Sequence, residues 1–234
     1  MAFLLHFARL FVSLHRKDSI VMNKNEKFVI TINREVGSGG HTVGRKLAEK
    51  LQVKYCDKAV VEGLTKKFGL TPERIEEIKA QKKSWWNDIN NYYQTLVNSA
   101  SQPMDAEVGL DNKSMFETEK RILQEIAAQT SCVVAGRTGF MVFRDWPNHL
   151  NIFIQASMEY RVQRIMRRQN VSEQEARDII ARMDSSRETY IQKYEDTSRY
   201  DTRNYQLVIS TDELSEDDAV EVIMNYINCT SKTR

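Results

Sequence analysis

Residues 28–48 read FVITINREVGSGGHTVGRKLA, an apolar and β-branched run that enters a glycine-rich turn and leaves it in an amphipathic pattern. Phe28–Ile32 predicts a buried strand, because this run is short, apolar and uncharged. The spacing of apolar residues over Gly40–Leu51 predicts a helix. A strand, a glycine turn and a helix N-terminus in this order favour phosphate binding, because backbone N–H groups and the helix dipole attract an anion there.

The candidate phosphate-binding residues are Gly37, Ser38, Gly39, Gly40, His41 and Thr42. The Thr42 hydroxyl can be offered to a phosphate or to Mg²⁺. This loop lacks the lysine that usually faces the outer phosphates of a nucleotide. If Thr42 takes the usual hydroxyl position, His41 stands where the lysine would be. Matching the helix through Leu47–Ala48 instead puts Gly40 there, and we favour this second register. The nearest replacement charges are Arg34, His41 and Arg45.

The composition is that of an ordinary globular domain. With 234 residues, of which 41% are hydrophobic, the chain can bury one substantial core. A formal net charge of +2 is too small to argue for a nucleic-acid partner. Cys56, Cys132 and Cys229 are scattered, which argues against a disulfide framework or a cysteine zinc site. Such cysteines are typical of a reducing compartment, so we expect a cytoplasmic protein.

Residues 1–26 are expected to form an N-terminal extension outside the folded domain. Ala2–Leu14 is rich in apolar residues, but His6 and Arg9 interrupt it, so no membrane-spanning helix is expected. A helix on a membrane surface is one alternative. The alternative that we favour is a segment upstream of a translation start at Met22.

Strands and helices alternate along the rest of the chain, which predicts one α/β domain over residues 27–228 and a tail at 229–234. Further strands are predicted at Val53–Tyr55, Ser131–Ala135, Leu150–Ile154 and Gln206–Ser210. Further helices are predicted at Asp57–Phe68, Thr71–Lys83, Ser114–Gln129, Ser157–Gln169, Ser172–Tyr194 and Leu214–Asn228. Asp57 and Thr71 are the expected N-caps of the first two. Residues 84–113 or thereabouts are aromatic, amide-rich and then loop-like, which we interpret as an inserted subdomain. This alternation is typical of a parallel sheet, whose ligands bind at the carboxyl ends of the strands.

Two predicted helices carry arginines that suit phosphate groups. Arg161, Arg164 and Arg168 are spaced to share one helix face, and their helix follows a strand that should end near the glycine loop. Arginine forks match phosphate oxygens; the alternative is an ordinary solvated basic face. Asp184 and Arg187 stand three residues apart on the next helix, where they form either an intrahelical ion pair or a grip on a substrate.

Taken together, these segments resemble the cytidylate kinase-like family of nucleoside monophosphate kinases, in the branch whose loop reads Gly-Ser-Gly-Gly. The matching segments are Ile32–Gly40 with Leu47–Glu49; Lys54–Lys58; Ala135–Arg137 with Val142–Phe143 and Asn151–Arg164; and Asp184–Arg187 with Tyr190, Tyr194 and Asn204–Ile209. They span about residues 28–227. The resemblance implies a P-loop kinase fold, a parallel sheet flanked by helices with a helical acceptor-side insert and an arginine-bearing lid. It also implies Mg²⁺-dependent phosphoryl transfer from ATP to CMP or dCMP.

The resemblance implies roles for particular residues as well. The glycine loop would hold the donor phosphates of ATP. The lid would carry Arg161 and Arg164. The acceptor site would be formed by Asp57, Arg137, Asp184 and Arg187. The candidate catalytic residues are Arg137, Arg161 and Arg164. Cytidylate kinases with a lysine-bearing loop have Asp after their Gly-Arg pair, where this chain has Thr138.

The sequence therefore predicts a kinase whose partners are small-molecule nucleotides, with no nucleic acid and no membrane expected. The missing lysine leaves a second hypothesis open, a nucleotide-binding protein with little or no kinase activity. Thr138 and the insert leave a third, a kinase for another small metabolite.

Overall fold

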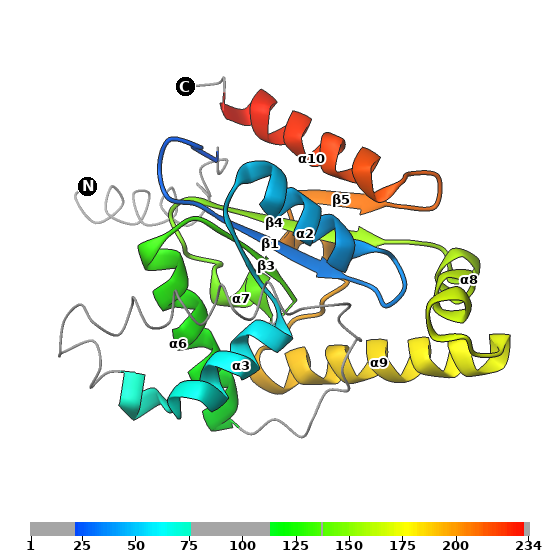
Figure 1. Cartoon of the computed structure of the whole chain (residues 1–234), viewed down its shortest axis with the longest axis horizontal. Coiled ribbons are helices and arrows are strands. Elements are labelled where there is room, and N and C mark those ends of the chain that lie inside the picture. The colour runs from blue at the N-terminus through cyan, green and yellow to red at the C-terminus, as the bar shows by residue number, and fades with distance from the viewer. Residues whose placement is uncertain (1–21, 76–112, 137, 232–234) are drawn as a thin grey trace, which may run out of the picture.

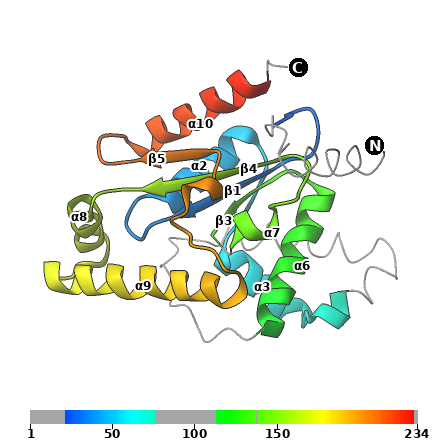
Figure 2. The same cartoon turned by 180° about the vertical axis from the view of Figure 1, so that it is seen from behind.

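The computed structural model describes residues 22–75, 113–136 and 138–231, which form a parallel β-sheet with helices on both faces (Figures 1 and 2). Within this part of the chain the strands are β1 (Val29–Arg34), β2 (Lys54–Cys56), β3 (Cys132–Ala135), β4 (His149–Gln155) and β5 (Leu207–Ser210). All neighbours pair in parallel, in the order β2-β3-β1-β4-β5. Because β1 lies in the middle, the loop that follows it opens at the centre of the carboxyl edge.

Helices cover the sheet on two sides. The helices are α2 (Gly40–Leu51), α3 (Lys58–Phe68), α6 (Lys113–Gln129), α7 (Gly139–Val142), α8 (Met158–Gln169), α9 (Glu173–Tyr194) and α10 (Glu216–Ser231), with a 3-10 turn, η1 (Thr202–Asn204). Side chains of β1 alternate between the faces. Ile30 and Ile32 pack in the core beneath α2 and α10, whereas Val29 packs with α3 and α6. All three are fully buried, so each face of the central strand has its own core.

Helix α8 lies beyond the carboxyl end of β4, and α9 runs back from it below the sheet, where Ile191 packs with Phe140 and Phe153 (Figure 1). Apolar residues of the two helices, among them Val162, Ile165 and Ile180, pack together with Val36 of the loop after β1. The segment before the glycine loop is therefore part of the core of this helix pair, which places α8 and α9 against the loop.

The predicted α/β fold with a parallel sheet is confirmed, and several predicted bounds need correction. β1 continues past Ile32, because Arg34 still pairs with Ile154 of β4. β2 covers Lys54–Cys56 rather than Val53–Tyr55. α10 begins after Leu214, since the Ser215 hydroxyl accepts a hydrogen bond from Asp218 N–H and so starts the helix there. α7 and η1 were not predicted, because elements of three or four residues show no hydrophobic period.

Some predictions fall outside the described residues. The helix start at Thr71 is present, with Thr71 Oγ1 accepting from Arg74 N–H at 3.2 Å, but its continuation and the insert lie outside. The described part opens with Met22, which is buried, and Lys24 Nζ donates to Asn228 Oδ1 of α10 at 2.6 Å. Among the residues described, no helix is both long and apolar enough to cross a membrane.

Candidate functional site

The glycine loop joins β1 to α2 at the carboxyl edge of the sheet. Gly37 and Gly39 have φ angles of +82° and +83°, a left-handed backbone that favours glycine. Gly39 is the N-cap of α2 and offers no side chain to its first N–H groups, whereas Asp57, Ser157 and Ser172 cap α3, α8 and α9. The first turn of α2 also carries no acidic residue. This helix N-terminus is therefore shaped to receive an external anion.

Hydrogen bonds hold the loop from its outer side. Ser38 Oγ donates to Glu35 O at 3.0 Å, and Thr211 Oγ1 donates to Ser38 O at 2.7 Å. Ser38 is fully buried. The Ser38 backbone N–H also donates to Glu35 O, at 3.4 Å, so Ser38 shapes the loop with all three of its polar groups. A loop held in this way needs little rearrangement when a ligand arrives.

A buried group of charges holds the segment between β1 and the loop. Arg161 is only 5% exposed, and its Nε donates to Val36 O at 2.8 Å. Its guanidinium pairs with Glu35 at 3.2 Å and with Asp184. Asp184 also accepts from Val36 N–H at 3.1 Å, and the fully buried Arg199 lies 3.5 Å from it. We call Glu35, Arg161, Asp184 and Arg199 the loop-anchoring cluster.

Arg187 lies at the rim of the loop-anchoring cluster. Its Nη1 is 3.9 Å from Asp184 Oδ1 and donates to Arg34 O at 3.5 Å, and its side chain is 18% exposed. The structure therefore brings the predicted residues Arg161, Asp184 and Arg187 together. Arg161 and Asp184 are buried and bonded to each other, whereas Arg187 still reaches solvent. Arg137 lies outside the described residues, so its roles in catalysis and acceptor binding stay predictions.

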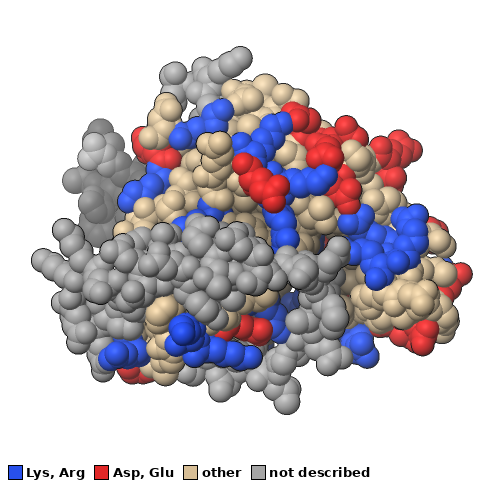
Figure 3. Space-filling view, viewed as in Figure 1, with Lys and Arg blue, Asp and Glu red and all other residues tan. Residues whose placement is uncertain are grey.

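Arg164 lies on the other side of the loop, next to Gly39. A Cβ atom added to Gly39 would be 3.5 Å from both Arg164 Cζ and Glu216 Oε1. Arg164 Nη2 pairs with Glu216 at 2.6 Å, and both side chains are partly exposed. Figure 3 shows basic side chains gathered over α8 and acidic ones over the start of α10 beside them. Arg164 thus stands where a ligand in the loop would compete with Glu216, while Arg168 faces solvent.

His41 and Asp57 form a pair behind the loop. His41 Nε2 donates to Asp57 Oδ2 at 3.0 Å, and Asp57 Oδ1 accepts from Val60 N–H at 3.1 Å. This second bond confirms the predicted helix cap. Burial alone would raise the pKa of Asp57, but hydrogen bonds from His41 and Val60 N–H outweigh it and lower the pKa below the ordinary value of 3.8. The carboxylate is therefore charged and fixed at neutral pH.

This pKa shift predicts a stability effect. Since the folded pKa of Asp57 lies below its unfolded value of 3.8, the charged form adds stability above that pH and loses it as the pH falls through the folded pKa. Asp57→Asn keeps a capping side chain but loses the charge, so it should lower the free energy of unfolding by about 1–3 kcal/mol at pH 7. In urea titrations this difference should shrink below about pH 4.

The His41→Ala background is the control for this prediction. There the main hydrogen bond to Asp57 is already gone, so Asp57→Asn should cost clearly less at pH 7. An equal cost in both backgrounds would contradict the pairing as the source of the effect.

The turn after β3 also has an unusual backbone. Gly136 has φ +77° and Thr138 has φ +53°. A β-branched residue in the left-handed region is strained. Gly139 N–H donates to Gly136 O at 2.9 Å, which closes the turn tightly before α7. Backbone strain of this kind gathers at functional sites, and this turn lies at the same sheet edge as the glycine loop, because Ile32 pairs with Ala135.

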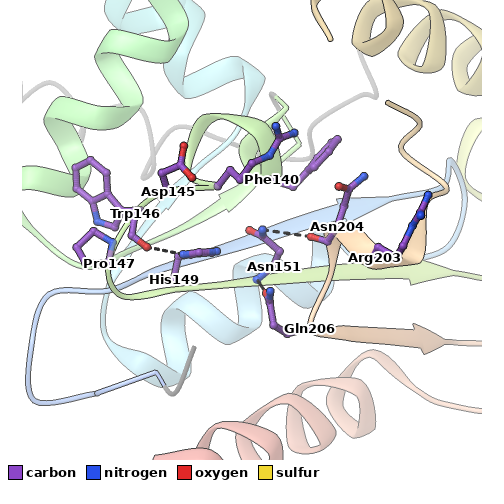
Figure 4. Close-up of a pocket in the computed structure, with 10 residues that line it drawn as sticks. Phe140, Asp145, Trp146, Pro147, His149, Asn151, Arg203, Asn204 and Gln206 are labelled. Atoms are coloured by element: carbon purple, nitrogen blue, oxygen red, sulfur yellow. Dashed lines mark hydrogen bonds between the residues drawn. The ribbon is translucent and has the colours of Figure 1, made fainter. Parts of the chain in front are cut away.

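A separate pocket of about 260 Å³ lies at the opposite end of the strands (Figure 4). His149 lines it and pairs in register with Val29, the first residue of β1. Two of its polar side chains are bonded within the protein: His149 Nδ1 contacts Trp146 O at 2.6 Å, and Asn151 Nδ2 donates to Asn204 O at 3.3 Å. This pocket is therefore distinct from the loop at the carboxyl edge.

A family model described as the cytidylate kinase-like family matches residues 29–213. The chain belongs to the cytidylate kinase-like family. Cytidylate kinases from Sulfurisphaera tokodaii and Sulfolobus acidocaldarius are 24% and 25% identical to it over 205 residues. These matches cover 86% and 85% of this chain and 95% and 93% of theirs. The crystal structure of an uncharacterized protein from Eubacterium ventriosum has a TM-score of 0.59 at 24% identity, covering 86% of this chain and 98% of that one.

Membership of the cytidylate kinase-like family confirms the predicted P-loop kinase fold and makes the chain a nucleotide or small-metabolite kinase by class. The matched residues contain the glycine loop and the whole loop-anchoring cluster. The sequence analysis gave no role to Glu35, Arg199 or Glu216. Glu35 lies in the loop segment quoted from the sequence, and its position next to the glycine loop could have marked it as a site residue. Nothing in the local pattern marks Arg199 as buried.

Proposed function

We propose that this protein transfers the γ-phosphoryl group of ATP to a nucleoside monophosphate, with CMP or dCMP as the acceptor. The observation that supports this most is the glycine loop, held in shape at the uncapped N-terminus of α2. A loop of this kind suits donor phosphates, and the curated relatives are cytidylate kinases. The reaction breaks the bond between the γ-phosphorus and the bridging oxygen. It forms one to an acceptor phosphate oxygen and releases ADP.

On this proposal, residues around the loop stabilise the transferring group. Loop N–H groups bind the donor phosphates. Arg164 leaves its ion pair with Glu216 and binds the phosphoryl oxygens, on which negative charge develops during the transfer. Thr42, in the first turn of α2, offers a hydroxyl oxygen of the kind that Mg²⁺ accepts. Within the described ranges no three His, Cys, Asp or Glu residues are grouped to hold a metal. Mg²⁺ would neutralise phosphate charge with most of its ligands drawn from phosphates and water.

The acceptor would lie over the rim of the loop-anchoring cluster. Arg187 is partly exposed, at 18%, whereas Arg161 and Asp184 are buried, so we assign Arg187 the contact with the acceptor phosphate. Asp184 is bonded to Arg161 and to Val36 N–H, so we assign it the placing of Arg187. Asp57 and Arg137 complete the acceptor site in this proposal.

A coupled assay of ADP release over a panel of ribo- and deoxyribonucleoside monophosphates tests the proposal. We expect acceptor-dependent ADP release that is fastest with CMP or dCMP. Arg187→Met should raise KM for the acceptor by about tenfold or more and leave KM for ATP unchanged, because the loss of a charge-assisted hydrogen bond costs about 1.5–3 kcal/mol. No acceptor-dependent ADP at high enzyme concentration, with any monophosphate, would exclude the proposal.

Thr138 favours one alternative acceptor, a small phosphorylatable metabolite other than a nucleoside monophosphate. Cytidylate kinases with a lysine-bearing loop have Asp at this position, and here a strained threonine stands there. A thermal-shift screen of small phosphorylatable metabolites distinguishes the two. A ligand present at 100 times its Kd should stabilise the protein by about 2.7 kcal/mol. A shift with CMP alone excludes the alternative. ATP and CMP binding without turnover would instead support a nucleotide-binding protein with little activity.

A further inference from the structure

Arg34 is the last residue of β1, and two glycines leave room for its side chain. A Cβ atom added to Gly40 would lie 2.6 Å from Arg34 Cβ and 3.1 Å from its Cγ. A Cβ atom added to Gly136 would lie only 2.1 Å from Arg34 Nη1. The stem of Arg34 therefore passes beneath the first residue of α2, and its guanidinium rests on the end of β3. Any larger residue at either glycine would have to displace it.

The other charges near the loop are already engaged. Arg161 and Arg164 pair with carboxylates. His41 is bonded to Asp57, and Arg45 lies 5.8 Å above the ring of Tyr55. Arg34 Nε is buried and has no hydrogen-bond partner within the described part of the chain. The same holds for Arg164 Nε, but Arg164 Nη2 pairs with Glu216, whereas the described residues offer Arg34 only an electrostatic attraction to Asp57. Of the three replacement charges that the sequence suggests, Arg34 is the one whose side chain packs against Gly40, the position that the lysine would take.

We infer that Arg34 supplies the positive charge that a loop lysine otherwise brings to the outer phosphates of the donor. In lysine-bearing loops the lysine stands where the helix opens. Here α2 opens at Gly40, in agreement with the register that puts Gly40 in the lysine position. The stem of Arg34 fills the space that a side chain at position 40 would need, and its fork suits phosphate oxygens. This inference rests on the proposed function for the identity of the ligand, ATP.

Exchanging the two positions tests this inference. Arg34→Ala should weaken ATP binding by about tenfold or more, and leave AMP binding within about twofold, because AMP has no outer phosphates. Gly40→Lys alone should also weaken ATP binding, since the new side chain meets that of Arg34. The double variant R34G/G40K should recover most of the lost ATP affinity, because glycine at position 34 removes both the Cβ and the Cγ atom that crowd a side chain at position 40. Calorimetric titration with ATP and AMP measures each affinity.

Two further variants keep the test decisive. Arg34→Met retains most of the apolar stem and loses the charge, so it should weaken ATP binding as much as Arg34→Ala does. It therefore tests the charge even if the shorter side chain of Arg34→Ala disturbs folding. Lys50→Met removes an exposed cation of α2 that pairs with Glu221, far from the loop, and should leave ATP affinity unchanged. The Gly40→Lys side chain also meets Ile154 Cβ at 3.2 Å, a contact that small movements relieve.

The outcomes separate this inference from the proposed function. Normal ATP affinity in Arg34→Met and Arg34→Ala overturns the inference, and so does a double variant no better than Gly40→Lys alone. If turnover of a nucleoside monophosphate persists in those cases, the kinase proposal stands without it. Recovery of ATP binding in R34G/G40K supports the inference even if no acceptor is phosphorylated. A wild-type chain that binds no ATP overturns both.

Discussion

Arg161→Met will lower the free energy of unfolding by about 3–5 kcal/mol, the cost of breaking a buried ion pair by removing one partner. Arg161 is bonded to Val36 O, Glu35 and Asp184. Its loss leaves the Glu35 carboxylate with only the hydrogen bond from Ala156 N–H, at 3.0 Å, among the described residues, and it removes the bond that holds Val36 O. Since a domain is stable by about 5–15 kcal/mol in total, this one change should remove a large part of the stability. Urea unfolding at pH 7 measures it.

Two variants make this result interpretable. Arg177→Met removes an arginine from an exposed i,i+4 pair with Glu173, so it should cost no more than about 0.5 kcal/mol. Arg161→Lys keeps the charge and loses the fork, and it should fall between the two. A loss below about 1 kcal/mol for Arg161→Met would show that the loop-anchoring cluster does not hold the loop.

The same cluster shows where sequence reasoning ends. The sequence predicts the strand, the loop and α2 because their signals are local: β-branched runs, glycines and apolar spacing. Arg161 and Arg164 are three residues apart and look alike in that pattern. Only the packing of α8 against α9 and the loop buries Arg161 beside Glu35 and leaves Arg164 at Glu216. Whether an arginine is buried depends on carboxylates far away in the chain, which no local pattern reveals.

The residues of the candidate site also differ in whether a local sequence pattern predicts them. The sequence points to the glycine loop, and Asp57 was correctly predicted as a helix cap, because both signals lie within a few residues. It does not single out Arg34 among the charges near the loop. That distinction depends on Gly136, which directly follows β3 and comes 102 positions after Arg34 in the chain. It reaches Arg34 only because β3 pairs beside β1.

Gly37→Ala will lower ATP affinity by about tenfold or more and destabilise the protein, whereas Gly69→Ala will do only the second. Both glycines have a left-handed backbone, with φ +82° and +57°, so alanine adds strain of about 1–2 kcal/mol at either position. Around Gly69 nothing lies within 4 Å of the new Cβ. At Gly37 the Cβ would be 2.9 Å from Arg161 O and 3.1 Å from Arg161 Cα. Backbone cannot turn aside as a flexible side chain does, so the loop and α8 must separate.

This comparison separates the effect of backbone strain from the effect of a close contact. Both substitutions introduce the backbone strain, but only at Gly37 does the added methyl group approach other atoms. Separation of the loop from α8 would move the N–H groups that we propose bind the donor phosphates, and it would pull on the bond between Arg161 and Val36. Calorimetric titration with ATP measures the change in ATP affinity, and urea unfolding measures the change in stability. Equal ATP affinity in Gly37→Ala, Gly69→Ala and the wild type would mean that the loop tolerates this movement, and the close approach of α8 would then have no part in binding.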